Sequence, residues 1–271
     1  GNMKKRVADI IMDTLVEYGI TDCFAVVGGG AMHLDNALLV CDKMNKVFNH
    51  HEQACAMAAE AYARYSGKMA AVCVTSGPGA TNTFTGIYTA MMDSIPLVVL
   101  TAQTTTPNLG KDAFQECDTS GMTFATVKHS YLVKDPNELP RVMKEAFHIA
   151  RTGRPGPVLI DLPKDVTAGI CTAPFTEEMN LPGYKIPGTA PDEMVEKAAA
   201  LINKAKRPLL LVGHGAMISD ACRQVREFAE KLNAPVTSTL LGLGVFPSNH
   251  DLSLGMLGMH GTVYANKAVL D

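Results

Sequence analysis

One carboxylate in this chain stands where acid–base chemistry can take place, at the start of a helix rich in small residues. The stretch Lys46–Arg64 reads KVFNHHEQACAMAAEAYAR, a short strand followed by a helix, and Glu52 lies at the turn between them. Small side chains let a helix approach its neighbours closely, so one face of this helix is predicted to be buried. A carboxyl group on the first turn of a buried helix is a candidate acid or base.

The residues beside Glu52 offer a second interpretation. Asn49 followed three positions later by Glu52 fits a capping box, and acidic side chains are favoured at the positive end of a helix. His50 and His51 are adjacent, point in different directions and have no third ligand at helical spacing, so they do not predict a metal site. These residues alone leave both the cap and the chemical role open.

Three loops are predicted at the carboxyl ends of parallel strands, where α/β proteins bind ligands. They are Gly28–Gly30, Asn49–Gln53 and Ser76–Asn82, the last reading SGPGATN. Glycines in such loops let a ligand or another backbone come close. SGPGATN could cradle a phosphate, although it lacks the Gly-Lys-Ser/Thr ending of a Walker A loop. Each loop by itself could equally be a tight strand-to-helix turn.

These loops belong to a pattern of buried strands that alternate with helices. Apolar runs predict strands over residues 23–27, 69–75, 97–102 and 157–162, and a short strand-like run covers 46–48. Helices are predicted over residues 6–18 and 32–40, in a helix that begins at 52, in another that follows the SGPG turn and ends near 92, and over 137–151. A loop-rich stretch is predicted from 103 to 130. Such an alternation is typical of a parallel sheet covered on both faces, so the predicted fold class is α/β with a doubly wound parallel sheet.

A second α/β unit is predicted after a stretch rich in Pro, Gly and Thr, which is typical of a linker. The predicted boundaries are 1–171 for the first domain, 172–190 for the linker and 191–271 for the second, Rossmann-like domain. In the second domain, helices are predicted over 192–203 and 220–232 and strands over 208–212 and 235–239. A doubly wound domain with two strands would leave unpaired edges, so this domain is expected to be incomplete.

Composition and charge restrict the class of protein. A length of 271 residues accommodates one large domain or two ordinary ones, and 47% hydrophobic with 19% charged residues is typical of a soluble α/β protein. The net charge of −3 without a basic block argues against nucleic-acid and anionic-membrane partners, and no apolar run is long enough to span a bilayer. The seven cysteines form no CxxC pair, which favours a reducing, cytoplasmic compartment.

Six motifs in a fixed order are more specific than any one loop. The chain resembles the large, catalytic subunit of acetolactate synthase, a thiamine-diphosphate enzyme of the pyruvate-oxidase type, through GGGA, HHEQACAMAAEAYAR, VTSGPGATN, DAFQE, GRPGPVLIDLPKDV and GMLGMHGT. The resemblance covers essentially the whole chain. It implies that the first domain binds the pyrimidine of thiamine diphosphate and that the second begins the central domain. It also implies a transferase that decarboxylates pyruvate and joins the product to a second 2-oxo acid, in branched-chain amino acid biosynthesis.

The resemblance assigns roles to residues around the glycine loops. Glu52 matches the family's essential carboxylate, which hydrogen-bonds N1′ of the cofactor's aminopyrimidine. Gly29 and Gly30 match glycines at the mouth of the active site, the first among the cofactor contacts and the second among the catalytic positions. Further cofactor contacts are expected at Thr75, Pro78 and Asn82.

Three more positions match groups near the reacting substrate. Gln115 in DAFQE and Lys164 in LPKDV match polar catalytic groups, and Phe114 matches part of the substrate wall. Taken alone, Gln115 could be a loop-capping amide and Lys164 a solvated charge after a strand.

In the family the central domain binds FAD, which takes no redox part in the main reaction. Arg154 matches an arginine that contacts FAD. The other matches are Gly213, His214, Gly215, Thr239, Leu240, Gly258, Met259 and His260. Taken alone, Gly213–Gly215 lacks the third glycine of a dinucleotide fingerprint, and GMLGMHGT could be a Met-rich loop packed on the core.

Two departures from the family concern the substrate channel. Val27-Gly28 stands where the family usually has Tyr-Pro, and TTTP follows Gln103 where synthases usually have Val-Pro-Thr. They leave the acceptor 2-oxo acid open. They also keep another thiamine-diphosphate 2-oxo acid decarboxylase or carboligase as an alternative function.

A third departure is that the chain contains no Gly-Asp-Gly motif. In the family this motif holds the diphosphate and Mg²⁺ in a third domain, and the cofactor lies between that domain and the pyrimidine domain of another subunit. The chain is therefore expected to be an N-terminal portion, inactive alone, of a homodimer or homotetramer that can also take a regulatory subunit. A non-catalytic binding or assembly module is the alternative from a different class.

Overall fold

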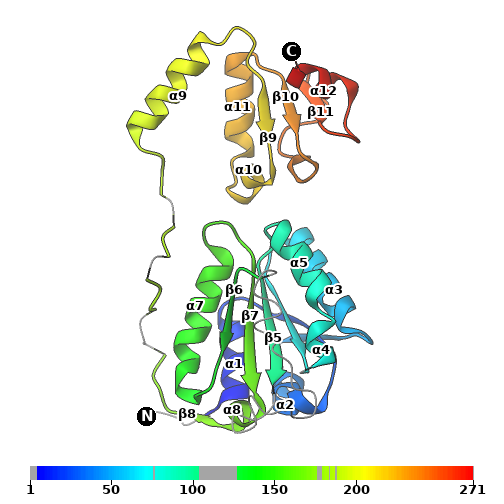
Figure 1. Ribbon diagram of the computed structural model, residues 1–271, viewed down its shortest axis with the longest axis vertical. Helices are drawn as coiled ribbons and strands as arrows, with labels where there is room; N and C mark the ends of the chain where they lie inside the picture. Colours follow the sequence, from blue (N-terminus) through cyan, green and yellow to red (C-terminus); the bar gives the residue numbers. More distant parts are fainter. Residues whose placement is uncertain are drawn as a thin grey trace. The chain divides into compact units, whose positions relative to one another are not determined.

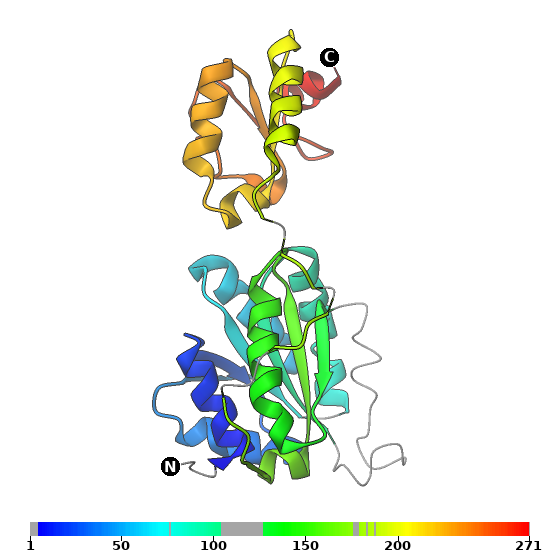
Figure 2. The same ribbon diagram turned by 90° about the vertical axis from the view of Figure 1, so that its left-hand side faces the viewer.

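The computed structural model describes residues 5–75, 77–103, 127–175, 179–182, 184–186 and 188–270. It divides into two compact units, residues 1–187 and 188–271. Figures 1 and 2 draw both units, and each has a parallel sheet and a hydrophobic core of its own.

A six-stranded parallel sheet forms the centre of the first unit, in the order β3-β2-β4-β5-β7-β6. Its strands are β2 (Asp22–Ala25), β3 (Asn45–Phe48), β4 (Ala70–Val74), β5 (Leu97–Gln103), β6 (His129–Leu132) and β7 (Pro157–Pro163). Every residue of β4, β5 and β7 is buried, because these strands lie inside the sheet and helices cover both its faces. The predicted α/β class with a parallel sheet is confirmed.

Two layers of helices cover this sheet, as Figures 1 and 2 show. One layer consists of α1 (Val7–Glu17), α2 (Met32–Val40), α7 (Leu139–Arg151) and α8 (Lys164–Ala168); the other consists of α3 (Glu52–Ser66), the one-turn α4 (Pro78–Thr81) and α5 (Phe84–Met92). α3 and α5 approach closely, because a Cβ on Gly86 would lie only 2.5 Å from the Cβ of Ala56. Among the described residues, no helix combines the length and the apolar composition needed to cross a bilayer.

Two details of the first unit differ from expectation. Most of the stretch 103–130, expected to be rich in loops, lies outside the described residues, but its last two residues belong to an unpredicted strand, β6. The sequence HSYL of β6 mixes polar and apolar residues because β6 is an edge strand with half-exposed side chains. The helix expected to end at residue 92 is two helices, since α4 ends at Thr81 and α5 begins at Phe84.

A three-stranded parallel sheet forms the centre of the second unit, in the order β11-β10-β9. Its elements are α9 (Asp192–Lys204), β9 (Leu210–Val212), α10 (His214–Ile218), α11 (Cys222–Leu232), β10 (Val236–Ser238), β11 (Ser253–Met256) and α12 (Val263–Leu270). The expectation of two strands is wrong. β11 reads SLGM, and Gly255, at a φ of +80°, interrupts the apolar pattern by which a strand is recognised.

Part of the segment predicted as a linker is fastened to the first unit. Directly after β8 (Ile170–Cys171), the backbone N–H groups of Thr172 and Ala173 donate to Oδ1 of Asn137 at 2.8 and 3.1 Å. Further along, the N–H of Asn180 donates to Oε1 of Glu145 on α7 at 2.8 Å. We call residues 179–182 and 184 the strap. Their hydrogen bonds are long-range contacts, which composition cannot predict.

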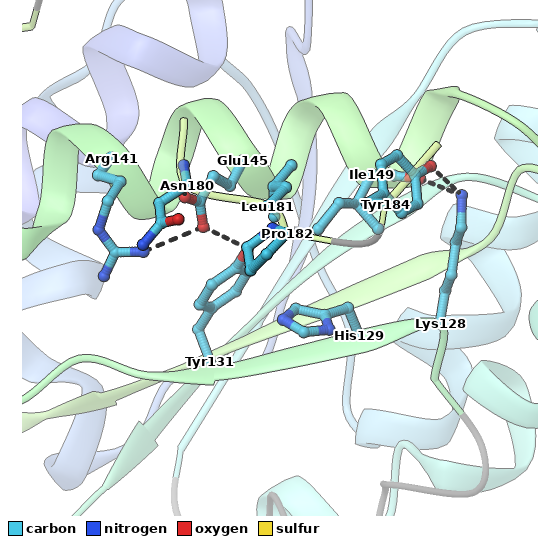
Figure 3. Close-up of a pocket in the computed structure, with 10 residues that line it drawn as sticks. All are labelled: Lys128, His129, Tyr131, Arg141, Glu145, Ile149, Asn180, Leu181, Pro182 and Tyr184. Atoms are coloured by element: carbon cyan, nitrogen blue, oxygen red, sulfur yellow. Dashed lines mark hydrogen bonds and ion pairs between the residues drawn. The ribbon is translucent and has the colours of Figure 1, made fainter. Parts of the chain in front are cut away.

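The strap, β6 and α7 surround a cavity of about 520 Å³, shown in Figure 3. The Glu145 side chain, only 1% exposed, accepts hydrogen bonds from Tyr131 at 2.8 Å and Arg141 at 3.1 Å. Burial and the bond to Glu145 raise the pKa of Tyr131. At the other end, the Lys128 ammonium donates to the hydroxyl of Tyr184 at 3.0 Å. One buried polar anchor, Glu145, and one half-buried anchor, Lys128, therefore hold the strap.

Candidate active site

The three predicted loops meet at one edge of the six-stranded sheet. β2, β3 and β4 are parallel neighbours, so their carboxyl ends lie side by side. Gly28–Gly30 follows β2, Asn49–His51 follows β3 and Thr75 follows β4. This edge is where doubly wound sheets bind their ligands.

Glu52 is the first residue of α3, and it is half-buried. His51 caps this helix, because its Nδ1 accepts a hydrogen bond from the N–H of the residue after Glu52 at 3.1 Å. The predicted capping box is wrong: the N–H of Asn49 still extends the sheet by donating to Ala25, and its Nδ2 donates to Sγ of Cys55 at 3.3 Å. The helix thus has its cap without the Glu52 carboxylate.

The Glu52 carboxylate faces the turn at α4. Its Oε2 accepts a hydrogen bond from Nδ2 of Asn82 at 3.3 Å, and a Cβ on Gly79 would lie 3.3 Å from its Oε1. A carboxylate in this position repels a phosphate, and α4 is only four residues long. The geometry therefore does not favour SGPGATN as a phosphate cradle.

Thr75 fills the space between two glycines. A Cβ on Gly28 would lie 2.6 Å from the Cβ of Thr75, and a Cβ on Gly79 would lie 2.8 Å from its Cγ2. Both distances are below those of real contacts, so glycine is required at both positions. The Oγ1 of Thr75 is buried and has no hydrogen-bond partner within the described residues. A buried hydroxyl without a partner calls for one, and a ligand can supply it.

Asp35 on α2 also belongs to this edge, although no motif singled it out. Its Oδ2 accepts a hydrogen bond from the N–H of Gly28 at 3.1 Å, whereas its Oδ1 is buried without a partner in the described part of the chain. Burial raises the pKa of Asp35 to about 6, against the opposing effect of the Gly28 hydrogen bond. The available signal was an acid within the apolar helix MHLDNALLV.

The remaining loop positions are also located. Gly29 and Gly30 lie in a one-turn 3-10 helix, Gly29–Ala31, and the space beside Gly29 is open. Pro78 is the first residue of α4. Gln115 and Phe114 lie outside the described residues.

Buried polar side chains continue along the edge at β5 and β7. Asp161 accepts hydrogen bonds from Oγ1 of Thr101 at 2.8 Å and Nε2 of Gln103 at 3.2 Å, and all three are buried. Lys164 begins α8 directly after β7 and is half-buried. Its position therefore lies at the same edge as Glu52 but farther along, since β5 separates β7 from β4.

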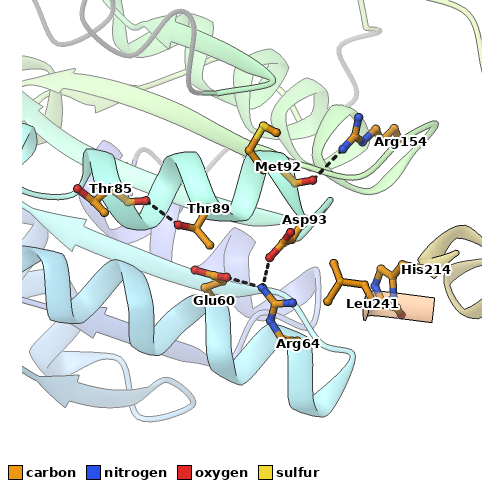
Figure 4. A network of polar contacts seen from close by, with 9 residues as sticks. All are labelled: Glu60, Arg64, Thr85, Thr89, Met92, Asp93, Arg154, His214 and Leu241. Atoms are coloured by element: carbon orange, nitrogen blue, oxygen red, sulfur yellow. Dashed lines mark hydrogen bonds and ion pairs between the residues drawn. The ribbon is translucent and has the colours of Figure 1, made fainter. Parts of the chain in front are cut away.

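Arg154 has a structural role within the first unit. Its Nε donates to Oγ of Ser94 at 2.7 Å and its guanidinium donates to the carbonyl oxygen of Met92 at 2.8 Å, as Figure 4 shows for Met92. Nearby, Arg64 pairs with Glu60 at 2.5 Å and with Asp93 at 2.6 Å. These contacts tie the end of α5 to its neighbours.

The predicted residues of the second unit gather at the carboxyl edge of its own sheet. Gly213–Gly215 follows β9, Thr239 and Leu240 follow β10, and Gly258–His260 follows β11. Oγ1 of Thr239 accepts a hydrogen bond from the N–H of Gly242 at 3.2 Å. Nδ1 of His214 lies 3.2 Å from the carbonyl oxygen of Leu241, to which it donates when it carries the proton.

Asn266 is a residue of this second edge that sequence reasoning missed. Its Oδ1 accepts from the N–H of Gly258 and its Nδ2 donates to the carbonyl oxygen of Gly258, both at 2.8 Å. The two bonds hold Gly258 at a φ of +99°.

Two family models match this chain. The model of the thiamine pyrophosphate enzyme N-terminal TPP binding domain matches residues 5–122, and the model of the thiamine pyrophosphate enzyme central domain matches residues 195–271. The chain belongs to the thiamine pyrophosphate enzymes. The N-terminal match includes Asp35, Glu52 and Thr75. Lys164 lies beyond it, although it belongs to the same compact unit.

This chain is similar, over nearly all of its 271 residues, to part of several acetolactate synthases. Acetolactate synthase 2 of Nicotiana tabacum is 44% identical over 98% of this chain and 40% of the relative. The acetolactate synthase large subunit of Buchnera aphidicola is 44% identical over 97% of this chain and 46% of that subunit. The acetolactate synthase of Arthrospira platensis is 45% identical, over 98% and 48% respectively. The chain therefore spans less than half the length of these relatives.

Proposed function

We propose that this chain is the part of an acetolactate synthase that receives the aminopyrimidine end of thiamine diphosphate. The whole enzyme would decarboxylate pyruvate and join the remaining two-carbon unit to a second 2-oxo acid, with release of CO₂. The observation that carries the proposal is the Glu52 carboxylate, free of capping duty and turned toward Asn82 and Gly79 at the carboxyl edge of the sheet. Three relatives with this activity in their names, 44–45% identical, support it.

The residues at this edge fit an aminopyrimidine. Such a ring carries nitrogen acceptors and an amino donor. The Oγ1 of Thr75, which has no partner in the described part of the chain, can serve either. Gly28 and Gly79 keep the backbone on both sides of Thr75 free of side chains. Glu52 would hold a proton between its carboxylate and a ring nitrogen, with Asn82 orienting the second oxygen.

The cofactor supplies the stabilisation of negative charge at the carbon that loses CO₂. The chain's own part is to bind and orient. Gly30 borders the open turn, Pro78 begins the α4 turn, and Lys164, Gln115 and Phe114 are proposed to contact the 2-oxo acids. The diphosphate and its Mg²⁺ would be held by residues outside this sequence, which has no Gly-Asp-Gly motif.

We propose FAD for the second unit on the carboxyl edge formed by Gly213–Gly215, Thr239–Leu240 and Gly258–His260. A Cβ on Gly215 or Gly258 would meet no atom within 4 Å, so the backbone there has space beside it for a ligand. Arg154 is proposed as a further contact. Its guanidinium would have to exchange the Met92 carbonyl for the cofactor.

A homo-oligomer, dimer or tetramer, is proposed from the outer face of α3 and α5. Met57, Tyr65, Tyr88 and Met92 expose between 43% and 95% of their surface there. Such large apolar side chains on neighbouring helices suit a second copy of the chain. A regulatory subunit remains a proposal from the family. The seven cysteines form no CxxC pair in the sequence, which supports a cytoplasmic location.

The test uses the whole enzyme that contains this chain, supplied with thiamine diphosphate, Mg²⁺ and a panel of 2-oxo acids. We expect acetolactate from pyruvate, and a second product when 2-oxobutanoate is added. Release of CO₂ without acetolactate would assign a decarboxylase instead, the alternative suggested by Val27-Gly28. Failure to bind thiamine diphosphate would leave a non-catalytic module.

A further inference from the structure

The burial of the Asp35 carboxylate is not explained by the hydrogen bonds that it makes in the described part of the chain. It is only 4% exposed, and a carboxylate that leaves water loses free energy unless its oxygens find donors. One donor is present, the N–H of Gly28 at 3.1 Å from Oδ2. The other oxygen, Oδ1, has no partner within the described residues. A purely structural acid would be expected to use both.

Gly28 is held from two sides. Asp35 accepts a hydrogen bond from its N–H, and Thr75 occupies the place of a side chain, since a Cβ on Gly28 would lie 2.6–3.0 Å from three atoms of Thr75. Gly28 is also the residue before the 3-10 turn Gly29–Ala31, and its carbonyl accepts from the N–H of Ala31 at 3.1 Å. Any movement of Gly28 must therefore move the turn or press on Thr75.

Thr75 passes this constraint on toward Glu52. Its Cγ2 lies against Gly79, and Gly79 lies beside Oε1 of Glu52. Asp35 is thus linked to Glu52 by a continuous series of contacts through Gly28, Thr75 and Gly79. The same carboxyl borders, with Val27, Gly29 and Met32, a hollow of about 400 Å³.

We propose that Asp35 is a positioning residue, which fixes the Gly28–Ala31 turn against Thr75 and thereby sets the width of the edge that receives the cofactor. The ligand in this statement rests on the proposed function. The positioning of Gly28 does not.

The other titratable groups near Asp35 do not stabilise its negative charge. The thiols of Cys23 on β2 and Cys73 on β4 lie near it, and burial raises the pKa of both, so they stay neutral. Neither thiol offsets a negative charge on Asp35 as a cation would. Among the described residues, the Gly28 N–H is the donor that the carboxylate uses.

The test compares Asp35→Leu and Asp35→Ala, which remove the acceptor, with Asp35→Asn, which keeps an oxygen for Gly28. Asp42→Asn serves as the control, because Asp42 is exposed just beyond α2. Amide hydrogen exchange of Gly28 is followed in this chain. We expect about 100-fold faster exchange in the Leu and Ala variants and little change in Asp35→Asn and Asp42→Asn.

The second readout is the KM of the whole enzyme for thiamine diphosphate, measured in the presence of Mg²⁺. We expect the KM for the cofactor to rise about tenfold in the Leu and Ala variants, the loss of one hydrogen bond to a charged group, with kcat nearly unchanged and rescue by Asn. Unchanged Gly28 exchange in both loss variants overturns the proposal. So does unfolding of both, because Asp35 would then hold the entire unit. If the unmodified enzyme does not bind thiamine diphosphate, the proposed function is wrong. The hydrogen exchange of Gly28 would still test the positioning role of Asp35.

Discussion

Asn82 donates a hydrogen bond to Glu52 across 3.3 Å, although thirty positions separate them in the chain. The contact exists because β3 and β4 flank β2 in parallel, so the loops after them open at the same edge. It joins two sequence motifs that neither composition nor periodicity connects.

Replacing Glu52 by Gln keeps the size of the side chain and removes the carboxylate. On the proposed function we expect kcat of the whole enzyme to fall about 10²–10⁴-fold, the usual contribution of a positioned acid or base. Steady-state kinetics with pyruvate measures it. Glu17→Gln, at the exposed end of α1, should leave kcat unchanged. An active Glu52→Gln enzyme would remove the central argument for the site.

Two adjacent glycines should differ sharply when each is changed to alanine. A Cβ at Gly28 would overlap Thr75, whereas a Cβ at Gly29 would meet no atom within 4 Å. We expect Gly28→Ala to lower the free energy of unfolding by about 1–3 kcal/mol, as overpacking does, and Gly29→Ala to change it by less than about 0.5 kcal/mol. Urea denaturation of both variants gives the comparison. Equal effects would mean that Thr75 is not packed against Gly28.

Replacement of Thr75 and of Thr101 by valine should change the stability of the chain in opposite directions. Oγ1 of Thr75 has no partner within the described residues, whereas Oγ1 of Thr101 donates to the buried Asp161 at 2.8 Å. We expect Thr75→Val to raise the free energy of unfolding of the free chain by about 1 kcal/mol and Thr101→Val to lower it by about 1–3 kcal/mol. Chemical denaturation distinguishes them. Loss of stability in Thr75→Val would reveal a partner for its hydroxyl.

Asp35 should make the stability of the chain depend on pH. Its pKa in the folded state, about 6, is above the ordinary value of 3.8, so the folded state binds more protons between these values. Stability contributed by Asp35 is therefore present at low pH and decreases as pH rises through 6, by on the order of 3 kcal/mol in total. Unfolding free energies from pH 4.5 to 7.5 should fall less steeply in Asp35→Asn. His33, whose pKa burial lowers, is common to both proteins and cancels in the difference. Parallel curves would exclude a titrating Asp35.

Glu145 should matter far more than an exposed acid. Its carboxylate is buried and binds Tyr131, Arg141 and the strap at Asn180, whereas Glu193 pairs with a lysine on the surface of α9 with its side chain 80% exposed. We expect Glu145→Ala to cost about 3–5 kcal/mol of unfolding free energy and Glu193→Ala less than about 1 kcal/mol. Denaturation measures both, and proteolysis should cut the strap faster in Glu145→Ala alone. If Glu145→Ala changed neither the unfolding free energy nor the proteolysis of the strap, the strap would be held by packing instead.

The sequence predicted those parts of the fold that depend on local pattern. The fully buried strands β4, β5 and β7 are continuous apolar runs, and α2 begins and ends at the predicted residues 32 and 40. It failed where long-range contacts decide. β6 is held by pairing with β7, and the strap by single side chains such as Glu145.

The candidate site divides in the same way. Glycine-rich loops after strands were recognisable, because backbone freedom at such positions has a sequence signature. The sequence offered Asn49 as a possible cap of α3, whereas the cap is His51, because the hydrogen bonds of the sheet extend past β3 as far as Asn49. Asp35 was missed because an acid in a helix is ordinarily exposed. Its burial is a property of the packed sheet.

The pairing of β1 (Lys5–Arg6) with β8 has a consequence for biosynthesis. Lys5 pairs with Cys171 and Arg6 with Ile170, so about 165 residues must be made after the first strand before its partner exists. At the usual ribosomal rate of roughly 5–20 residues per second, β1 waits on the order of ten to thirty seconds with its edge unpaired. Closure of the first unit is therefore among the last events of its folding on the ribosome. Chaperones that bind short extended segments would meet β1 during that interval.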